Sequence, residues 1–204
     1  NVYRTLFSCL DYTTLDGTDN RKKVEELCRK AVGFGEKGLP LPAAVCIYPP
    51  FVSTARKYLQ GTSIRVATTA AAFPSGQMAL KIKLQEVEYV VGEGADEVDI
   101  VISRGTFLEE NYQEVFDEIS EIKSRCGQAA LKVILETGEL KTAVNIARAS
   151  EIAILAGADF IKTSTGKVVP AATPEAAGIM SLVIREHFLA TGQKTGLKPA
   201  GGIA

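Results

Sequence analysis

Two lysines near the end of the chain have the surroundings that covalent amine chemistry requires. Lys162 and Lys198 each close a short apolar segment, and each is followed by small residues, Thr-Ser-Thr-Gly after the first and Pro-Ala-Gly-Gly after the second. A lysine at the end of a buried strand is desolvated, and a second cation nearby also lowers its pKa, so it could be neutral at pH 7. Small residues let a substrate approach the backbone. The alternative is that both are ordinary solvated lysines.

Few other residues are available for chemistry. The four cysteines are far apart, without a Cys-x-x-Cys pair that would indicate zinc or redox work. The single histidine, His187, lies in a predicted helix beside Arg185 and Glu186 and is expected to be a surface residue. A histidine-ligated metal site and a Ser-His-Asp triad therefore lack their parts, and lysine and carboxylate groups must carry any catalysis.

Composition predicts one globular domain over residues 1–204. The chain is 46% hydrophobic and 23% charged, and its 23 basic and 24 acidic residues give a net charge of −1. No charged patch favours nucleic acid or an anionic membrane, and no segment has the roughly 18 consecutive apolar residues of a membrane span. We expect a cytoplasmic protein with reduced thiols.

Apolar runs and helical periodicity alternate along the chain, which indicates parallel β/α units. The predicted strands are 5–10, 43–48, 64–69, 97–102, 131–135, 159–162 and 195–198. The predicted helices are 19–32, 51–59, 78–92, 110–126, 141–156 and 174–189.

Such units form either an open doubly wound sheet or a closed barrel. The first predicted strand is followed by Asp-Tyr-Thr-Thr-Leu at 11–15, and not by the glycine-rich turn of the open fold. Polar residues instead recur at the carboxyl ends of the predicted strands, where barrel enzymes place their sites: Asp11, Cys46, Asp99, Glu136, Lys162 and Lys198. We therefore predict an α/β fold of the (β/α)8 TIM barrel class, although the chain ends before an eighth strand.

Four motifs resemble the deoxyribose-phosphate aldolase family. They are Ala-Asp-Glu-Val-Asp-Ile-Val at 95–101, Leu-Lys-Val-Ile-Leu-Glu-Thr-Gly-Glu-Leu at 131–140, Phe-Ile-Lys-Thr-Ser-Thr-Gly-Lys at 160–167 and Gly-Leu-Lys-Pro-Ala-Gly-Gly at 196–202. The resemblance begins near residue 10 and covers nearly the whole chain. It implies a metal-free class I aldolase without a cofactor, which interconverts 2-deoxyribose 5-phosphate with acetaldehyde and glyceraldehyde 3-phosphate.

Carried over motif by motif, the resemblance makes Lys162 the Schiff-base lysine, Lys198 the neighbouring lysine that tunes it, and Asp99 the proton-shuttling carboxylate. Free lysine has a pKa near 10.4, so only about one amine in a few thousand is neutral at pH 7. A depression of about three units would make half of them reactive, and we expect Lys198 and burial to lower the pKa of Lys162 together.

A second group of residues is expected to bind the substrate. Backbone N–H groups of Gly166, Gly201 and Gly202, with the Lys167 ammonium, occupy the position after the late strands where barrels bind phosphate. The remaining candidates are Asp11, Cys46, Lys132 and Thr165. Lys132 and Glu136 fall on one face of their strand, and they extend the polar network or form a buried ion pair. For Cys46 the alternative is a buried free thiol.

Two departures from the family pattern stand out. Ala70, Ala71 and Ala72 occupy positions where many members carry a polar residue or glycine, and the chain stops at Ala204, before the eighth strand. We expect the sequence to be part of a longer polypeptide.

Two other functions stay open: another class I barrel aldolase with a different donor, and a non-catalytic sugar-phosphate binding protein. The expected partner is a small phosphorylated sugar, and a homodimer is one expected assembly because dimers are common among such barrels.

Overall fold

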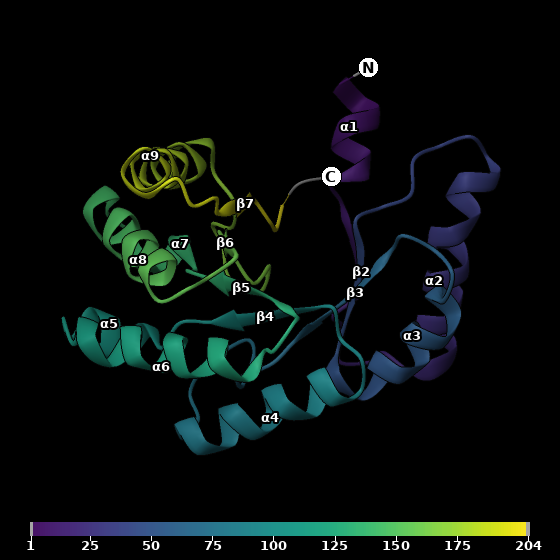
Figure 1. Cartoon of the computed structure of the whole chain (residues 1–204), viewed down its shortest axis with the longest axis horizontal. Coiled ribbons are helices and arrows are strands. Elements are labelled where there is room, and N and C mark those ends of the chain that lie inside the picture. Colours follow the sequence, from purple (N-terminus) through teal and green to yellow (C-terminus); the bar gives the residue numbers. More distant parts are fainter. Residues whose placement is uncertain (1, 203–204) are drawn as a thin grey trace.

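Seven parallel strands in sequential order form the sheet of the described chain, residues 2–202 of a computed structural model (Figure 1). The strands are β1 (Asp11–Thr13), β2 (Ala44–Ile47), β3 (Arg65–Thr69), β4 (Glu97–Val101), β5 (Ala130–Ile134), β6 (Phe160–Lys162) and β7 (Gly196–Lys198). Each strand pairs in parallel with the next, and the curved sheet is that of a (β/α) barrel. This confirms the predicted fold class, and the sheet of residues 2–202 has seven strands.

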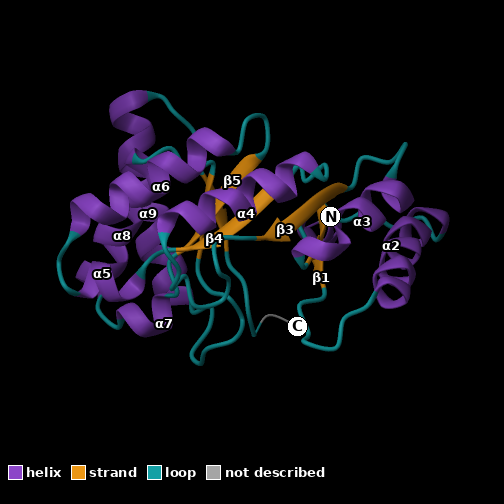
Figure 2. Cartoon of the chain, turned by 90° about the horizontal axis from the view of Figure 1, so that it is seen from below, coloured by secondary structure: helices purple, strands orange, loops and turns teal. Residues whose placement is uncertain are grey.

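Most of the helices surround the outer face of the curved sheet, as Figures 1 and 2 show, with α2 and α3 at one end of the arc and α8 and α9 at the other. The helical segments are α1 (Val2–Ser8), α2 (Arg21–Glu36), the 3-10 turn η1 (Pro49–Phe51), α3 (Val52–Leu59), α4 (Leu80–Gly92), α5 (Arg104–Leu108), α6 (Tyr112–Arg125), α7 (Thr137–Leu140), α8 (Ala143–Leu155) and α9 (Pro174–Thr191). None of these helices is long and apolar enough to cross a membrane.

Local sequence explains where the longer helices begin. The side chains of Asn20, Thr142 and Thr173 each accept a hydrogen bond from a backbone N–H three residues later, which satisfies a donor that the first helical turn leaves free. Pro174 follows Thr173 at the first helical position, where its missing N–H costs nothing.

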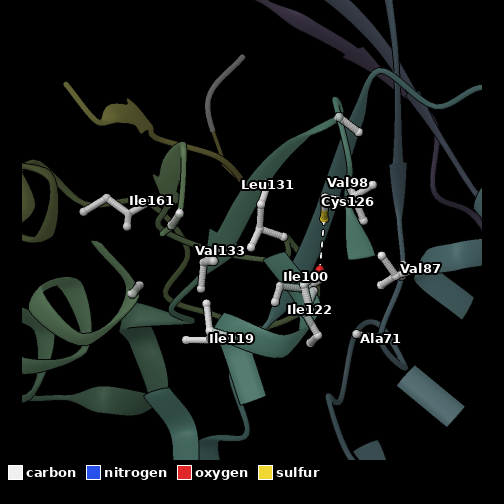
Figure 3. Close-up of a cluster of buried hydrophobic side chains, with 14 of the residues drawn as sticks. Ala71, Val87, Val98, Ile100, Ile119, Ile122, Cys126, Leu131, Val133 and Ile161 are labelled. Atoms are coloured by element: carbon white, nitrogen blue, oxygen red, sulfur yellow. Dashed lines mark hydrogen bonds between the residues drawn. The ribbon is translucent and has the colours of Figure 1, made fainter. Parts of the chain in front are cut away.

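The main hydrophobic core lies between the outer face of the sheet and the helices. Figure 3 shows part of it, where Val98 and Ile100 of β4 and Val133 of β5 meet Ile119 and Ile122 of α6. Because side chains alternate across a strand, the residues between these apolar ones face the barrel interior. The outer core therefore fixes which polar groups point inward.

The predicted first strand is wrong. Residues 2–8 form helix α1, in which no residue is buried, and β1 begins only at Asp11. Tyr3, Leu6, Phe7 and Leu10 recur at helical spacing, and this period should have outweighed the short apolar run. Asp11 is thus at the start of its strand and not after its carboxyl end.

Candidate active site

The inward-facing positions of β4, β5 and β6 bring together the charged residues that the sequence singled out. Asp99 lies between the outward-packed Val98 and Ile100, and its Cα is the register partner of that of Lys132. Lys162 closes β6 with its side chain on the same interior side. Three neighbouring strands therefore supply one carboxylate and two amines to a common site.

Lys162 and Asp99 form a direct buried pair. The Lys162 Nζ donates to Asp99 Oδ2 at 2.7 Å, and Asp99 is fully buried while Lys162 is 7% exposed. The other oxygen, Asp99 Oδ1, is also buried and lies 3.2 Å from Lys132 Nζ. The Lys162–Asp99 pair therefore has a proton that can pass between the amine and the carboxylate.

The charges set the two pKa values in opposite directions. Burial raises the pKa of Asp99, but the adjacent Lys132 and Lys162 outweigh it and hold the pKa of that carboxyl below its ordinary value. Burial lowers the pKa of Lys162, but the Asp99 carboxylate outweighs it and the pKa of Lys162 ends above its ordinary value. The expected lowering of the pKa of Lys162 is therefore wrong for this state, because its nearest charge is an anion.

Lys132 is the centre of a larger ion network. Its Nζ lies 2.9 Å from Asp11, 2.5 Å from Glu97 and 3.2 Å from Asp99, and its side chain is 2% exposed. Burial lowers the pKa of Lys132, but the three carboxylates hold it well above its ordinary value. Lys132 therefore joins the network, and it is not the partner of Glu136, whose side chain binds elsewhere.

Glu97 is the member of this network that sequence reasoning missed. It lies two residues before Asp99, so strand alternation places both carboxylates on the interior face of β4. The spacing of two residues between Glu97 and Asp99 is the sequence feature from which Glu97 could have been predicted.

Lys198 connects the last strand to the first. Its Cα is the register partner of Lys162, while its Nζ lies 2.7 Å from Asp11 Oδ1 and donates to the Cys9 carbonyl at 2.8 Å. The cation that lowers the pKa of Lys162 in this arrangement is Lys132. The tuning role of Lys198 stays a prediction.

Cys46 lies in a small apolar cluster on the interior side of the sheet, with Leu15, Ala44 and Ala67. Burial, aided by the negative charge of Asp99, raises the pKa of the Cys46 thiol to about 12. The side chain is therefore a neutral thiol beside the ion network, and substrate contact by it stays a prediction.

The glycines after β6 and β7 lie against each other. Gly166 and Gly201 have φ of 78° and 83°, which favours glycine, and a Cβ on Gly201 would lie 3.1 Å from the Gly166 Cα. Within residues 2–202 the N–H groups of Gly166, Gly201 and Gly202 donate no hydrogen bond. Free N–H groups from two adjoining loops are the donors that an anion requires.

Thr165 and Lys167 are held by the protein itself. The Thr165 hydroxyl donates to Glu136 at 2.5 Å, and the Lys167 Nζ donates to the Leu15 carbonyl. The structure thus places both residues beside the glycines, while their contact with substrate stays a prediction.

Two of the three alanines after β3 have a left-handed backbone conformation. Ala71 and Ala72 have φ of 56° and 61°, and the Ala72 N–H donates to Glu86 at 2.8 Å. His187 lies on α9, outside the ion network. Within the described chain, no group of three histidine, cysteine or acidic side chains is arranged to hold a metal ion.

Comparisons with known proteins identify a family that the chain resembles over nearly its whole length. The family model described as DeoC/LacD family aldolase matches residues 5–204. The chain is 45% identical to human deoxyribose-phosphate aldolase over 207 residues, which cover 95% of this chain and 65% of the human protein. It is 44% identical to the mouse deoxyribose-phosphate aldolase, with the same two coverages.

A solved structure described as QR15, an aldolase, superposes with a TM-score of 0.85 and 31% identity, over 97% of this chain and 81% of that one. The chain therefore shares the fold of these aldolases, and it spans about two thirds of the length of the curated relatives.

Proposed function

Because the chain belongs to the DeoC/LacD aldolase family, we propose that it reversibly cleaves 2-deoxyribose 5-phosphate to acetaldehyde and glyceraldehyde 3-phosphate through a Schiff base on Lys162. The observation that carries the proposal is the buried contact of 2.7 Å between Lys162 Nζ and Asp99. It joins the nucleophile that this chemistry needs to a group that can accept its proton.

In the proposed reaction, Lys162 transfers a proton to Asp99 and the neutral amine attacks C1 of the sugar aldehyde. The carbinolamine loses water after Asp99 returns the proton to its hydroxyl, which leaves a protonated imine. Asp99, again a carboxylate, takes the C3 hydroxyl proton as the C2–C3 bond breaks, and the electron pair of that bond passes into the imine to give an enamine. Glyceraldehyde 3-phosphate leaves, Asp99 returns the proton to C2, and water then hydrolyses the imine to release acetaldehyde and the free lysine.

We assign the other predicted residues to this reaction by position. Lys132, Asp11 and Lys198 hold the charge balance around Asp99, and Cys46 lines the interior beside it. Gly166, Gly201 and Gly202 are proposed to receive the phosphate, with Thr165 and Lys167 fixing the first of these loops. We place the reaction in the cytoplasm, in a single barrel domain that takes no cofactor. The four free thiols fit that reducing compartment.

The experiment that tests the proposal is reductive trapping. Incubation with acetaldehyde and borohydride should add one ethyl group to Lys162 and abolish cleavage of 2-deoxyribose 5-phosphate. The Lys162→Met variant should not be ethylated. Lys83 provides an internal control, because it is also a buried lysine paired with a carboxylate, Glu118, but it lies outside the ion network of the barrel interior. Peptide mapping should show Lys83 unmodified.

The other outcomes identify the alternatives. Efficient trapping with a three-carbon ketone in place of acetaldehyde indicates another class I aldolase. Sugar-phosphate binding without trapping or cleavage indicates a non-catalytic binding protein.

A further inference from the structure

Glu136 has an unfavourable backbone conformation at a buried position directly after β5. Its φ of 55° and ψ of 61° are left-handed, which a residue with a Cβ adopts rarely, and its side chain is fully buried. A strained residue of this kind persists only where its surroundings require it, often at a functional site. The contacts of the Glu136 carboxylate indicate which function this backbone conformation supports.

The Glu136 carboxylate binds the loop after β6 at Thr165. The Thr165 N–H donates to Glu136 Oε1 at 3.2 Å, and the Thr165 hydroxyl donates to Oε2 at 2.5 Å. The same hydroxyl accepts from the Lys167 N–H at 3.0 Å. A continuous hydrogen-bonded path therefore holds both neighbours of Gly166, whose own N–H stays free within the described chain.

The turn that follows Glu136 supports the same loop at two further points. The Thr137 N–H donates to the Thr163 carbonyl at 2.9 Å. A Cβ on Gly138 would lie 2.1 Å from the Pro170 carbonyl oxygen, so only glycine permits this close approach. The loop from 163 to 170 therefore rests on the segment from Glu136 to Gly138.

Arg104 compensates the buried charge of Glu136. Its Nη1 lies 3.6 Å from Glu136 Oε2 and also pairs with Glu139, while its Nη2 donates to the carbonyls of Pro74 and Ser75 at 3.1 and 2.9 Å. Without this guanidinium, a buried carboxylate so close to Gly166 would repel an incoming anion. With it, Glu136 can hold the loop without opposing a phosphate.

We infer that Glu136 is a positioning residue for phosphate: it fixes Gly166 against Gly201 so that the two loops present their free N–H groups to the phosphate monoester of the substrate. The inference rests on the proposed function for the identity of the substrate. Glu136 acts through Thr165 and does not touch the reacting atoms. Its loss should therefore affect recognition of the phosphate and not imine formation on Lys162.

The test compares Glu136→Gln with Glu118→Gln. Glutamine keeps one acceptor for Thr165 but removes the charge-assisted bond to its hydroxyl. Glu118 provides a matched control, since its carboxylate also accepts from a hydroxyl and pairs with a cation, but its partners are Ser103 and Lys83 and not residues of the 163–170 loop. Both variants are measured for cleavage of 2-deoxyribose 5-phosphate and of unphosphorylated 2-deoxyribose, for trapping with acetaldehyde and borohydride, and for binding of inorganic phosphate by calorimetry.

For Glu136→Gln, we expect KM for the phosphorylated sugar to rise roughly tenfold, the effect of one lost charge-assisted hydrogen bond. Phosphate binding should weaken to a similar degree, while trapping and cleavage of 2-deoxyribose stay unchanged. Glu118→Gln should match the wild type throughout. If Glu136→Gln does not fold, Glu136→Asp keeps the charge but draws the carboxylate back from the Thr165 hydroxyl, and it should give the same pattern.

Unchanged phosphate affinity in the variants would overturn the inference, as would a parallel loss of trapping and phosphate recognition. Failure of the wild type to trap acetaldehyde would instead contradict the proposed function. Even if the wild type does not trap acetaldehyde, phosphate calorimetry would still test the role of Glu136. A wild type that binds no phosphate would overturn the inference.

Discussion

At the scale of single residues, the site depends on the balance between burial and ion pairing. Lys162 and Asp99 are both desolvated, and each is kept charged by the other. Lys132 also stabilises the Asp99 carboxylate, whereas its like charge lowers the pKa of Lys162. The raised pKa of Lys162 means that the resting lysine is an ammonium, so nucleophilic attack requires proton transfer within the pair. In the proposed reaction, Asp99 therefore has two opposing effects on Lys162: it stabilises the ammonium, and it is the base that removes the proton.

Asp99→Asn separates these two effects. Without the carboxylate, the pKa of Lys162 should fall, because the largest influence that raises it is gone. The pH at which half of the protein is trapped by acetaldehyde and borohydride should therefore move to lower pH. Cleavage should nevertheless slow by roughly 10²- to 10⁴-fold, the usual contribution of a general acid–base.

Glu97→Gln is the control for this prediction, because Glu97 pairs with Lys132 and Arg65 but not with Lys162. Its trapping midpoint should stay near that of the wild type. An unmoved midpoint in Asp99→Asn would mean that Asp99 does not set the pKa of Lys162.

The sequence predicted the residue types of the site but not their charge coupling. Lys162, Lys198 and Asp99 were identified by their positions at or near strand ends, and the structure places all three beside the barrel interior. The direction of the pKa shift of Lys162 could not be read from the chain, because it depends on a contact between residues 63 positions apart. The sequence identified both Lys198 and Asp99, but it did not show that the Asp99 carboxylate would lie nearest to the Lys162 amine.

At the scale of secondary-structure elements, the short helix α7 supports the loop after β6, although it has only four residues. Its glycine lies against the backbone of Pro170, and its first N–H holds Thr163. Helices of this length cannot be predicted from periodicity, since one turn contains no repeat. The long helices α2, α4, α6, α8 and α9 were predicted to within a few residues because each contains several turns of one pattern.

Replacing glycine by alanine at two helical positions should have opposite effects. Gly138→Ala should destabilise the protein by about 1–3 kcal/mol, because the methyl group would displace the Pro170 backbone. Gly178→Ala, within α9 and with open space around its Cα, should stabilise it by about 0.5–1 kcal/mol through lower chain entropy of the unfolded state. Urea unfolding of both variants measures the difference, and equal effects would contradict the packing described for Gly138.

At the scale of the whole molecule, Lys132 joins strands from both halves of the sheet. It comes from β5 and pairs with Asp11 of β1 and with Glu97 and Asp99 of β4. The alternation of strands and helices predicted the barrel, but a network through its interior depends on curvature that local patterns do not contain. For that reason the sequence left open whether Lys132 joined the network or formed an ion pair with Glu136.

Lys132→Met should lower the free energy of unfolding at pH 7 by about 3–5 kcal/mol, because it leaves buried carboxylates without their cation. In the wild type, the depressed pKa of Asp99 adds stability above the unfolded-state pKa, which is lost as the pH falls through the folded-state value. The raised pKa of Lys132 adds stability that persists through neutral pH and is lost only at high pH.

The difference between the wild type and Lys132→Met should therefore persist from pH 5 to 9 and shrink below about pH 4, where free carboxylates take up protons. Urea titrations across this range measure it. A difference that does not depend on pH would indicate lost packing and not lost charge pairing.

The bond from Lys198 to the carbonyl of Cys9 joins residues that are 189 positions apart. During synthesis, Asp11 and Cys9 leave the ribosome long before Lys198 exists, so this part of the site cannot form on a partly made chain. Contacts of such sequence separation also carry the largest loop-closure cost and tend to form late in folding. The order of synthesis thus delays the complete ion network until the seven strands are in place. A nascent chain therefore cannot hold the full set of charges around Lys162.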